Sequence, residues 1–470
     1  MTAVAAGPSV AEPPVAAGVM PGARWAFADR IDLMDESLRE GAERASVPPD
    51  LDAKCDLARA IADVGIRTLV VGMFPDVPQN AELLARLVRR QQAGQLPADL
   101  RFMVISHVGV TMRQTLALLD ELAIPLDTVH VIAIHSVSDL QITHLFPTIL
   151  RKDGAVDWDQ AAWEALDDAT RRARNLDWLA DFLPVVTGWR GGGVMVGLLD
   201  AFRADHGHLM NAVATVAAAG IRQIRLVDTA GTCLPHQLPQ TVGEPVARFP
   251  DIAFYGHFHD DFGMSTANAV MGLSLGLKGV DVSVGGFANR AGHPPLAEVV
   301  MALRKLYGVE LPGMDATRLH GLSRMAERIY GLMENPAQAI TGVVTHSVQS
   351  GIRTELLRKA PRIFDAIAPE EVGARLVAMF GVRSGRDGLL RFLRERQLLA
   401  PFGLEPTPEI ADALFEHLDA EWALRSAGAR ARLGELIEQY QDTLNASFFT
   451  EEAMTSWLSA HLTAVHMKTA

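Results

Sequence analysis

Residues 223–259 read QIRLVDTAGTCLPHQLPQTVGEPVARFPDIAFYGHFH, with an apolar run rich in β-forming residues at each end. These two runs, 223–229 and 252–259, flank a longer segment, which is the pattern of strand–helix units around a parallel sheet. Six similar runs lie at 30–35, 67–74, 101–109, 129–136, 193–199 and 279–286. Eight such units in about 270 residues predict a closed (β/α)8 TIM barrel of the α/β class rather than an open doubly wound sheet.

The other regions of the chain have different patterns. Apolar residues at three- and four-residue spacing predict helices over 81–90 and 158–182, and the strand-like runs end near residue 305. A mainly helical C-terminal region is therefore expected after the barrel. The expected regions are a disordered tail at 1–24, a barrel domain at 25–310, helical subdomains at 311–400 and a C-terminal helical segment at 401–470.

The composition excludes several classes of protein. Of 470 residues, 49% are apolar and 21% are charged, which is typical of a folded globular chain. The net charge of −13 and the lack of a basic block argue against a nucleic-acid or anionic-membrane surface. Two cysteines, Cys55 and Cys233, are too few for a disulfide framework, and we find no signal peptide or membrane-spanning run. A cytoplasmic protein is expected.

Three polar clusters follow predicted strands, where a barrel carries its working residues: 35–41, 257–261 and 289–293. His257 and His259 are two residues apart, so alternation places both imidazoles on one face of their strand. Glu40 follows the first strand and can lie beside them, which leaves open positions for substrate on a shared metal. Taken alone, the two histidines are equally well read as polar residues at a strand end.

Several motifs then resemble one family. DESLREG (35–41), LVDTAGTCLP (226–235), HFHDDFGMSTANA (257–269) and GGFANRAGHPPLAEVV (285–300) are similar to signatures of the metal-dependent acyl-CoA condensing enzymes. This family includes the 2-isopropylmalate and homocitrate synthases, with 3-hydroxy-3-methylglutaryl-CoA (HMG-CoA) lyase as a more distant relative. THSVQSGI (345–352) and the stretch 367–389 resemble post-barrel motifs of the synthases, which the lyase lacks.

The resemblance implies a divalent metal (Mg2+, Mn2+ or Zn2+) held by Glu40, His257 and His259, with His293 as a further ligand where the family usually has Asn. A nitrogen ligand there favours a metal such as Zn2+.

Roles for other residues follow from the same resemblance. Arg39 is expected to stabilise negative charge on the carbonyl oxygen, although a surface salt bridge is the alternative. Thr229 is expected to bind a substrate carboxylate, or simply to cap the next helix. His346 is expected to assist deprotonation of the acyl-CoA in a partner subunit's barrel, or to be structural, and Gly286 and Arg290 to bind the acyl-CoA.

Three further positions, which line the substrate pocket in the family, have lost their charge: Val71, Met195 and Leu199 stand where charged residues are usual. A pocket without a fixed cation disfavours a second carboxylate, which predicts a 2-oxo acid with an uncharged side chain unless Arg203 or Arg290 fills the gap.

The sequence leaves three alternative functions open. The first is condensation of an acyl-CoA, most simply acetyl-CoA, with a 2-oxo acid, followed by thioester hydrolysis. The second is carbon–carbon cleavage by a lyase or aldolase, and the third a non-catalytic barrel. Small-molecule substrates are expected, in a homodimer whose C-terminal helices cover the partner's active site.

Overall fold

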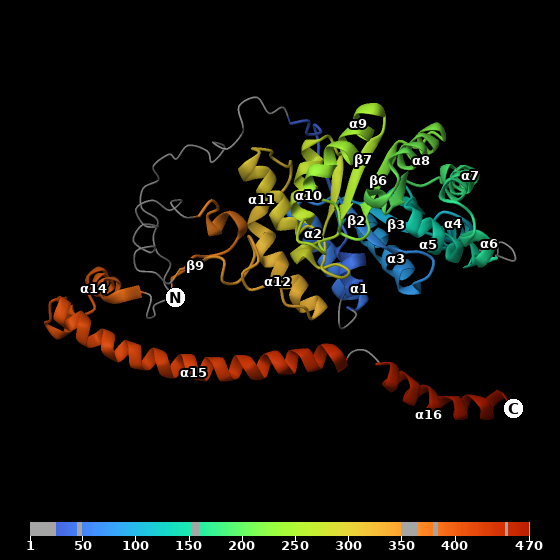
Figure 1. Ribbon diagram of the computed structural model, residues 1–470. Coiled ribbons are helices and arrows are strands. Elements are labelled where there is room, and N and C mark those ends of the chain that lie inside the picture. The colour runs from blue at the N-terminus through green and yellow to red at the C-terminus, as the bar shows by residue number, and fades with distance from the viewer. Residues whose placement is uncertain are drawn as a thin grey trace.

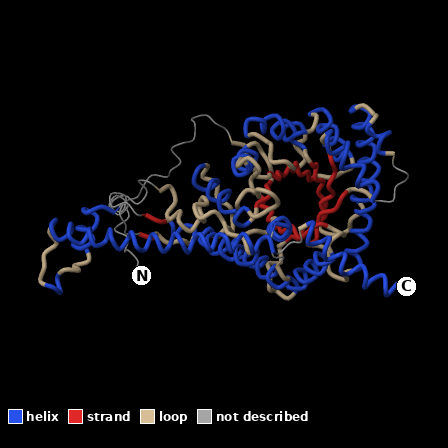
Figure 2. The backbone as a smooth tube through the Cα atoms, turned by 60° about the horizontal axis from the view of Figure 1, so that its bottom comes forward, coloured by secondary structure: helices blue, strands red, loops and turns tan. Residues whose placement is uncertain are grey.

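The structure is a computed structural model that describes residues 25–44, 49–152, 159–348, 365–378, 384–446 and 450–469. The expected tail at 1–24 lies outside these residues. Eight parallel strands form a closed barrel in chain order, because β1 pairs with both β2 and β8 (Figure 2). The strands are β1 (Asp32–Asp35), β2 (Thr68–Met73), β3 (Arg101–His107), β4 (Val129–Ser136), β5 (Gly193–Leu199), β6 (Gln223–Asp228), β7 (Ala253–Phe258) and β8 (Gly279–Val282). The predicted TIM barrel is confirmed.

Helices connect the strands and surround the barrel (Figures 1 and 2). They are α1 (Ala42–Arg44), α2 (Leu51–Val64), α3 (Pro78–Gln92), α4 (Val110–Glu121), α5 (Asp139–Lys152), α6 (Gln160–Glu164), α7 (Asp168–Thr187), α8 (His206–Ala218), α9 (Glu244–Arg248), α10 (Ser265–Ser274) and α11 (Leu296–Leu306). The single helix predicted over 158–182 is wrong. Asp167 interrupts it, because its extended backbone and its side chain, which accepts from Thr170 N, start α7 as a separate helix.

Alternation along the strands separates two apolar layers. One faces the helices, and the other fills the barrel interior with residues such as Met34, Met103 and Met195. The inference that Val71 faces the interior is wrong: Val71 packs in the outer layer, and Val70 faces inward. The strand register shifts between Val70 and Gly72, and such an irregularity changes which residues face each side. The interior position is apolar in either case.

The C-terminal region is mainly helical, as predicted. It contains α12 (Leu319–Tyr330), α14 (Gly385–Glu395), α15 (Pro408–Ala446) and α16 (Glu451–Thr469). The expectation that strands stop near 305 is wrong in one detail: β9 (Ser347–Val348) and β10 (Val377–Ala378) form a two-stranded parallel sheet. α15 runs as a long helix beneath the barrel in Figure 1. In the part of the chain that the structure describes, no helix combines the length and hydropathy needed to cross a membrane.

Candidate metal centre

The segment after β1 forms a π-helical turn, Ser37–Gly41, a rare conformation that occurs often at functional sites. Ser37 anchors this turn through two hydrogen bonds. Its backbone N donates to Asp35 Oδ1 at 2.9 Å, and its side-chain Oγ accepts from Val284 N at 2.8 Å. Tyr330, fully buried at the end of α12, donates its hydroxyl to the carbonyl of Ser37. Residues beyond the eighth barrel helix therefore hold the turn that carries Arg39 and Glu40.

Four predicted ligands meet at the barrel mouth: Glu40, His257, His259 and His293. Each offers one ligand atom, and these atoms all lie within 4.8 Å of one another. All four residues are buried, and Nε2 of His257 lies 3.3 Å from Nε2 of His259. The ring of His293 lies 4.3 Å from that of His257 and 4.5 Å from that of His259, between centroids. Residues far apart in the sequence thus form one compact group.

A glycine-dependent loop delivers His293 to this group. Gly286 has a φ of +74°, and a Cβ there would lie 3.0 Å from Pro295 Cγ. Gly292 has a φ of +110°, and its Cβ would lie only 2.2 Å from the carbonyl oxygen of Gly286. His293 N donates to that same oxygen at 3.1 Å. The loop can close this tightly only with glycine at both positions.

The donor atoms of the group fit a divalent cation. Both ring nitrogens of His293 and Nδ1 of His259 are buried without a hydrogen-bond partner among the described residues. Burial lowers the pKa of His259 to about 4 and those of His257 and His293 well below the ordinary value, so the imidazoles are neutral and their lone pairs are available. Although burial opposes its charge, Arg39 holds the pKa of Glu40 well below its usual range. Three nitrogens and one carboxylate oxygen suit a transition metal or zinc.

Arg39 lies against this group rather than on the surface. Its Nη1 is 2.8 Å from Glu40 Oε1 and 3.3 Å from Glu36 Oε2, and its side chain is only 13% exposed. Its Nε is buried without a hydrogen-bond partner in the described part of the chain. The Nε lies 3.8 Å from Glu43 Oε1, and the burial of the side chain argues against the alternative of a surface salt bridge.

A second set of charged residues lies directly beneath, and sequence reasoning missed it. Arg225 of β6 is 2% exposed, and its Nη1 contacts Glu36 Oε1 at 2.9 Å and Asp281 Oδ2 at 3.0 Å. The same Asp281 oxygen lies 2.5 Å from His257 Nδ1. Burial raises the pKa of Asp281 to about 6 and that of Glu36 to about 7, while Arg225 opposes both shifts. Charged residues inside apolar strand runs, QIRLVD and GVDVSV, were the signal that could have found them.

Thr229 follows β6 and Arg290 lies in the loop after β8, and both are outside the group of four. Arg290 binds Asp261 through two nitrogens, at 2.8 and 2.9 Å, and donates to the carbonyl of Thr229 at 2.6 Å. Thr229 Oγ1 accepts from Asp200 N at 2.9 Å, so its own hydroxyl proton can still be donated. Arg290 thus ties together the loops after β6, β7 and β8.

His346 lies elsewhere in this chain, just before β9. Its Nε2 lies 2.8 Å from the carbonyl oxygen of Ile340, at hydrogen-bond distance, and β10 reaches its backbone through Val377 N. The structure of a single subunit does not bring His346 to the group of four.

Comparison with known proteins decides the family. The model of the HMGL-like family matches residues 30–326, which cover the barrel and the first part of α12. The chain belongs to the HMGL-like family. This confirms the resemblance inferred from the motifs.

Relatives in this family are condensing synthases by name. The chain is 28% identical over 386 residues to a probable 2-isopropylmalate synthase of Methanopyrus kandleri, covering 82% of this chain and 68% of that protein. It is 26% identical to the homocitrate synthase AksA of the same organism, over 87% of this chain and 92% of the relative. It is 28% identical to the 2-phosphonomethylmalate synthase of Streptomyces rubellomurinus, over 87% and 97%.

Among solved structures, an HMG-CoA lyase of Acinetobacter baumannii in complex with coenzyme A and 3-methylmalate matches with a TM-score of 0.50 and 17% identity. The match covers 72% of this chain and 98% of that chain. This likeness concerns the fold alone.

Proposed function

We propose that this HMGL-like protein condenses an acyl-CoA, most simply acetyl-CoA, with a 2-oxo acid and hydrolyses the thioester, giving a 2-hydroxy-dicarboxylate-type product. The observation that carries the proposal is the convergence of Glu40, His257, His259 and His293 beside Arg39. The synthase names of its relatives support the same reaction. In it, a carbon–carbon bond forms between the acyl methyl carbon and the keto carbon, and water releases free CoA.

Glu40, His257, His259 and His293 would hold one divalent metal, Mg2+, Mn2+ or Zn2+. Such a metal, when bound, supplies Lewis-acid polarisation of the keto group. The three neutral imidazoles favour Zn2+ within this set.

The remaining roles belong to the chain's own side chains. Arg39 would stabilise the oxygen that gains negative charge, because its guanidinium lies beside the four ligands, with Nη1 2.8 Å from Glu40 Oε1. Thr229 donates its hydroxyl to the carboxylate of the 2-oxo acid. Gly286 and Arg290 shape the acyl-CoA end of the site, and His346 of the partner subunit assists removal of the methyl proton.

The acceptor is proposed to carry an uncharged side chain. Inside the barrel, on the side of β2 to β5, lie Val70, Met73, Ile105, Ile134 and Leu199, here called the apolar half, and His107 and Ser136 end β3 and β4 on the same inward face.

The two cations that could have offset a second carboxylate are engaged elsewhere. Asp200 binds Arg203 through two contacts of 2.8 Å, and Asp261 binds Arg290. Neither arginine is therefore free to pair with a distal carboxylate, and burying an ion without a countercharge costs on the order of several kcal/mol.

The homodimer remains part of the proposal, and the C-terminal helices support it. α15 and α16 expose large apolar side chains, including Leu424, Leu433, Ile437, Trp457 and Leu462. Exposed apolar surface of this extent is typical of an interface.

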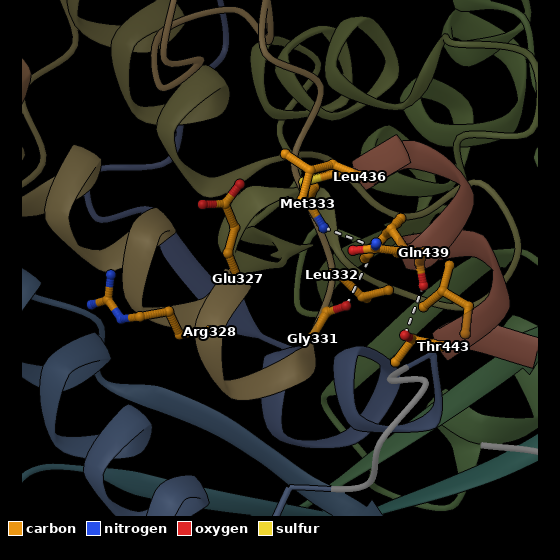
Figure 3. Close-up of a pocket in the computed structure, with 10 residues that line it drawn as sticks. Glu327, Arg328, Gly331, Leu332, Met333, Leu436, Gln439 and Thr443 are labelled. Carbon is orange, nitrogen blue, oxygen red and sulfur yellow. Dashed lines mark hydrogen bonds between the residues drawn. The ribbon is translucent and has the colours of Figure 1, made fainter. Parts of the chain in front are cut away.

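α15 has an anchor on its own subunit. Tyr440 accepts from Met333 N at 3.2 Å and donates to Gly331 O at 3.3 Å, beside a cavity of about 530 Å³ between α12 and α15 (Figure 3). The first turns of α15 contact α14, where Arg386 pairs with Asp412 at 2.8 Å, so the length between these two contacts is available to a second copy.

A substrate screen tests the reaction. Metal-loaded enzyme is mixed with acetyl-CoA and a panel of 2-oxo acids, and a thiol reagent reports free CoA. Release that depends on a 2-oxo acid supports condensation. Cleavage of a 3-hydroxyacyl-CoA or of a 2-hydroxy acid, without such release, would instead favour the lyase or aldolase.

A further inference from the structure

A buried carboxylate behind the metal ligands has no role in the function proposed above. We propose that Asp281, held by Arg225, is a positioning residue that orients His257 for metal binding. The inference rests on the proposed metal centre and adds to it the residues that align one ligand.

Contacts around Asp281 determine which nitrogen of His257 carries the proton. Asp281 Oδ2 lies 2.5 Å from His257 Nδ1, and Arg225 Nη1 lies 3.0 Å from the same oxygen. A carboxylate beside a guanidinium accepts hydrogen bonds, so the proton of the imidazole is on Nδ1. The lone pair of His257 is then on Nε2, the atom that lies 3.3 Å from Nε2 of His259. Asp281 thus turns the ligating nitrogen toward the other ligands.

Backbone placement makes the contact rigid. Arg225, His257 and Asp281 lie on β6, β7 and β8, three consecutive strands of the closed barrel, and all three are at most 2% exposed. Side chains that leave rigid strands inward have little freedom to move. The ring of His257 is therefore fixed before any metal arrives.

Glu36, His257 and Asp281 also lie close enough together to suggest a second metal site. Arg225 argues against it, because one Nη1 already bridges Glu36 and Asp281, at 2.9 and 3.0 Å. The guanidinium takes the place that a cation would need. Glu36, Arg225 and Asp281 therefore support the four proposed ligands and do not form a metal site of their own.

Arg225 also restrains Arg39 through Glu36. Glu36, which it binds through Oε1, contacts Arg39 through Oε2 at 3.3 Å. The same guanidinium therefore restrains His257 through Asp281 and Arg39 through Glu36.

Metal binding tests the inference without any turnover. The affinities of Zn2+ and Co2+ are measured by chelator competition and by the visible absorption of bound Co2+, for wild type, Asp281→Ala and Asp281→Asn. We expect Asp281→Ala to bind about tenfold to a hundredfold more weakly. Asp281→Asn should fall between, because Arg225 can only donate and so keeps the amide oxygen facing His257.

Glu334→Gln is the matched control. Glu334 is a buried carboxylate paired with Arg324 and bonded to Ser323 Oγ at 2.9 Å, and it lies outside the group of four. Its loss should lower the melting temperature and leave metal affinity unchanged. Equal weakening in the control and in Asp281→Ala would overturn the positioning role.

The remaining outcomes are also decisive. If Asp281→Ala does not fold, Asp281→Asn decides: an affinity within twofold of wild type overturns the inference, and a clear loss with an altered Co2+ spectrum supports it. Wild type that binds metal but condenses no substrate would reject the proposed reaction and leave the positioning role intact. Wild type that binds no metal would reject both.

Discussion

The two halves of the barrel mouth differ sharply in chemistry. The half formed by β6, β7, β8 and the turn after β1, here called the polar half, places Arg39, Glu40, His257, His259 and His293 over a buried ionic support. The apolar half, from β2 to β5, presents mainly valine, methionine, isoleucine and leucine, with His107 and Ser136 at the ends of β3 and β4. The fold supplies the same scaffold to both, since strand ends and following loops carry function in such barrels.

This contrast separates two questions about function. Side chains of the polar half are those that the family motifs also pick out, and we propose that this half holds the metal and forms the bond. The apolar half departs from the charged pattern that the resemblance implies, and we propose that it sets which acceptor is chosen. Changes in one half should therefore alter rate or metal affinity, and changes in the other should alter specificity.

The largest effect is expected from Arg39→Met in the polar half. Removing a charge donor aimed at a developing oxyanion lowers kcat by about 10²- to 10³-fold. Metal content should persist, because the four ligands remain.

Arg101→Met is the control for that change. Arg101 pairs with Asp32 at 2.5 Å, at the opposite end of the barrel, and its loss should spare kcat. A kcat for Arg39→Met within threefold of wild type would contradict the assigned role.

A smaller effect is expected from His293→Asn, which removes one nitrogen ligand. Zn2+ affinity should fall about tenfold to a hundredfold, while Mg2+ affinity changes less, because Mg2+ prefers oxygen ligands. Chelator competition with each metal measures both, and His144→Asn on the exposed face of α5 serves as the control. Unchanged Zn2+ affinity would remove His293 from the ligand set.

Leu199→Arg in the apolar half should shift the acceptor preference toward a dicarboxylate. Leu199 is partly exposed at the mouth end of β5, so a guanidinium there can reach a distal carboxylate. We expect the ratio of kcat/KM for 2-oxoglutarate over a small apolar 2-oxo acid to rise about tenfold. One new, partly exposed ion pair stabilises the bound dicarboxylate by about 1 kcal/mol. Wild type that already prefers the dicarboxylate would show that the apolar half is not the acceptor site.

The smallest effect concerns acid stability behind the apolar half. His135 of β4 and His208 of α8 share Asn175, and burial lowers the pKa of each histidine to about 4. The unfolded chain binds these protons near pH 6.5, so stability is full above that pH and falls as the pH drops toward 4. Urea unfolding should show a loss of about 1 kcal/mol between pH 7 and 6. His135→Leu should reduce that slope, and an unchanged slope would assign it to other groups.

Much of the fold was predictable because barrel strands are buried on both faces and so form continuous apolar runs. β4 and β5 have the predicted bounds. The irregularity between Val70 and Gly72 was not predictable. Val70 and Val71 are both apolar, so the sequence does not show which of them faces the barrel interior. Asp167 could have been recognised as a helix start, because Asp is a strong N-cap residue.

The ligand group was predictable from its spacing and from the family motifs, but its support was only partly so. Alternation would place Asp281 on an inward face, yet nothing in the sequence pairs it with Arg225. The contact of Tyr330 with Ser37 joins residues 293 positions apart, and only the packed structure brings α12 to the turn. Long-range contacts of this kind depend on the geometry of the whole barrel.

The metal content of the purified protein tests the central claim most directly. Wild type, His257→Ala and His259→Ala are dialysed against a weak chelator, and bound divalent metal is measured per chain. The account predicts one ion per chain in wild type and almost none in either variant. Stoichiometric metal in the variants, or none in wild type, would contradict it.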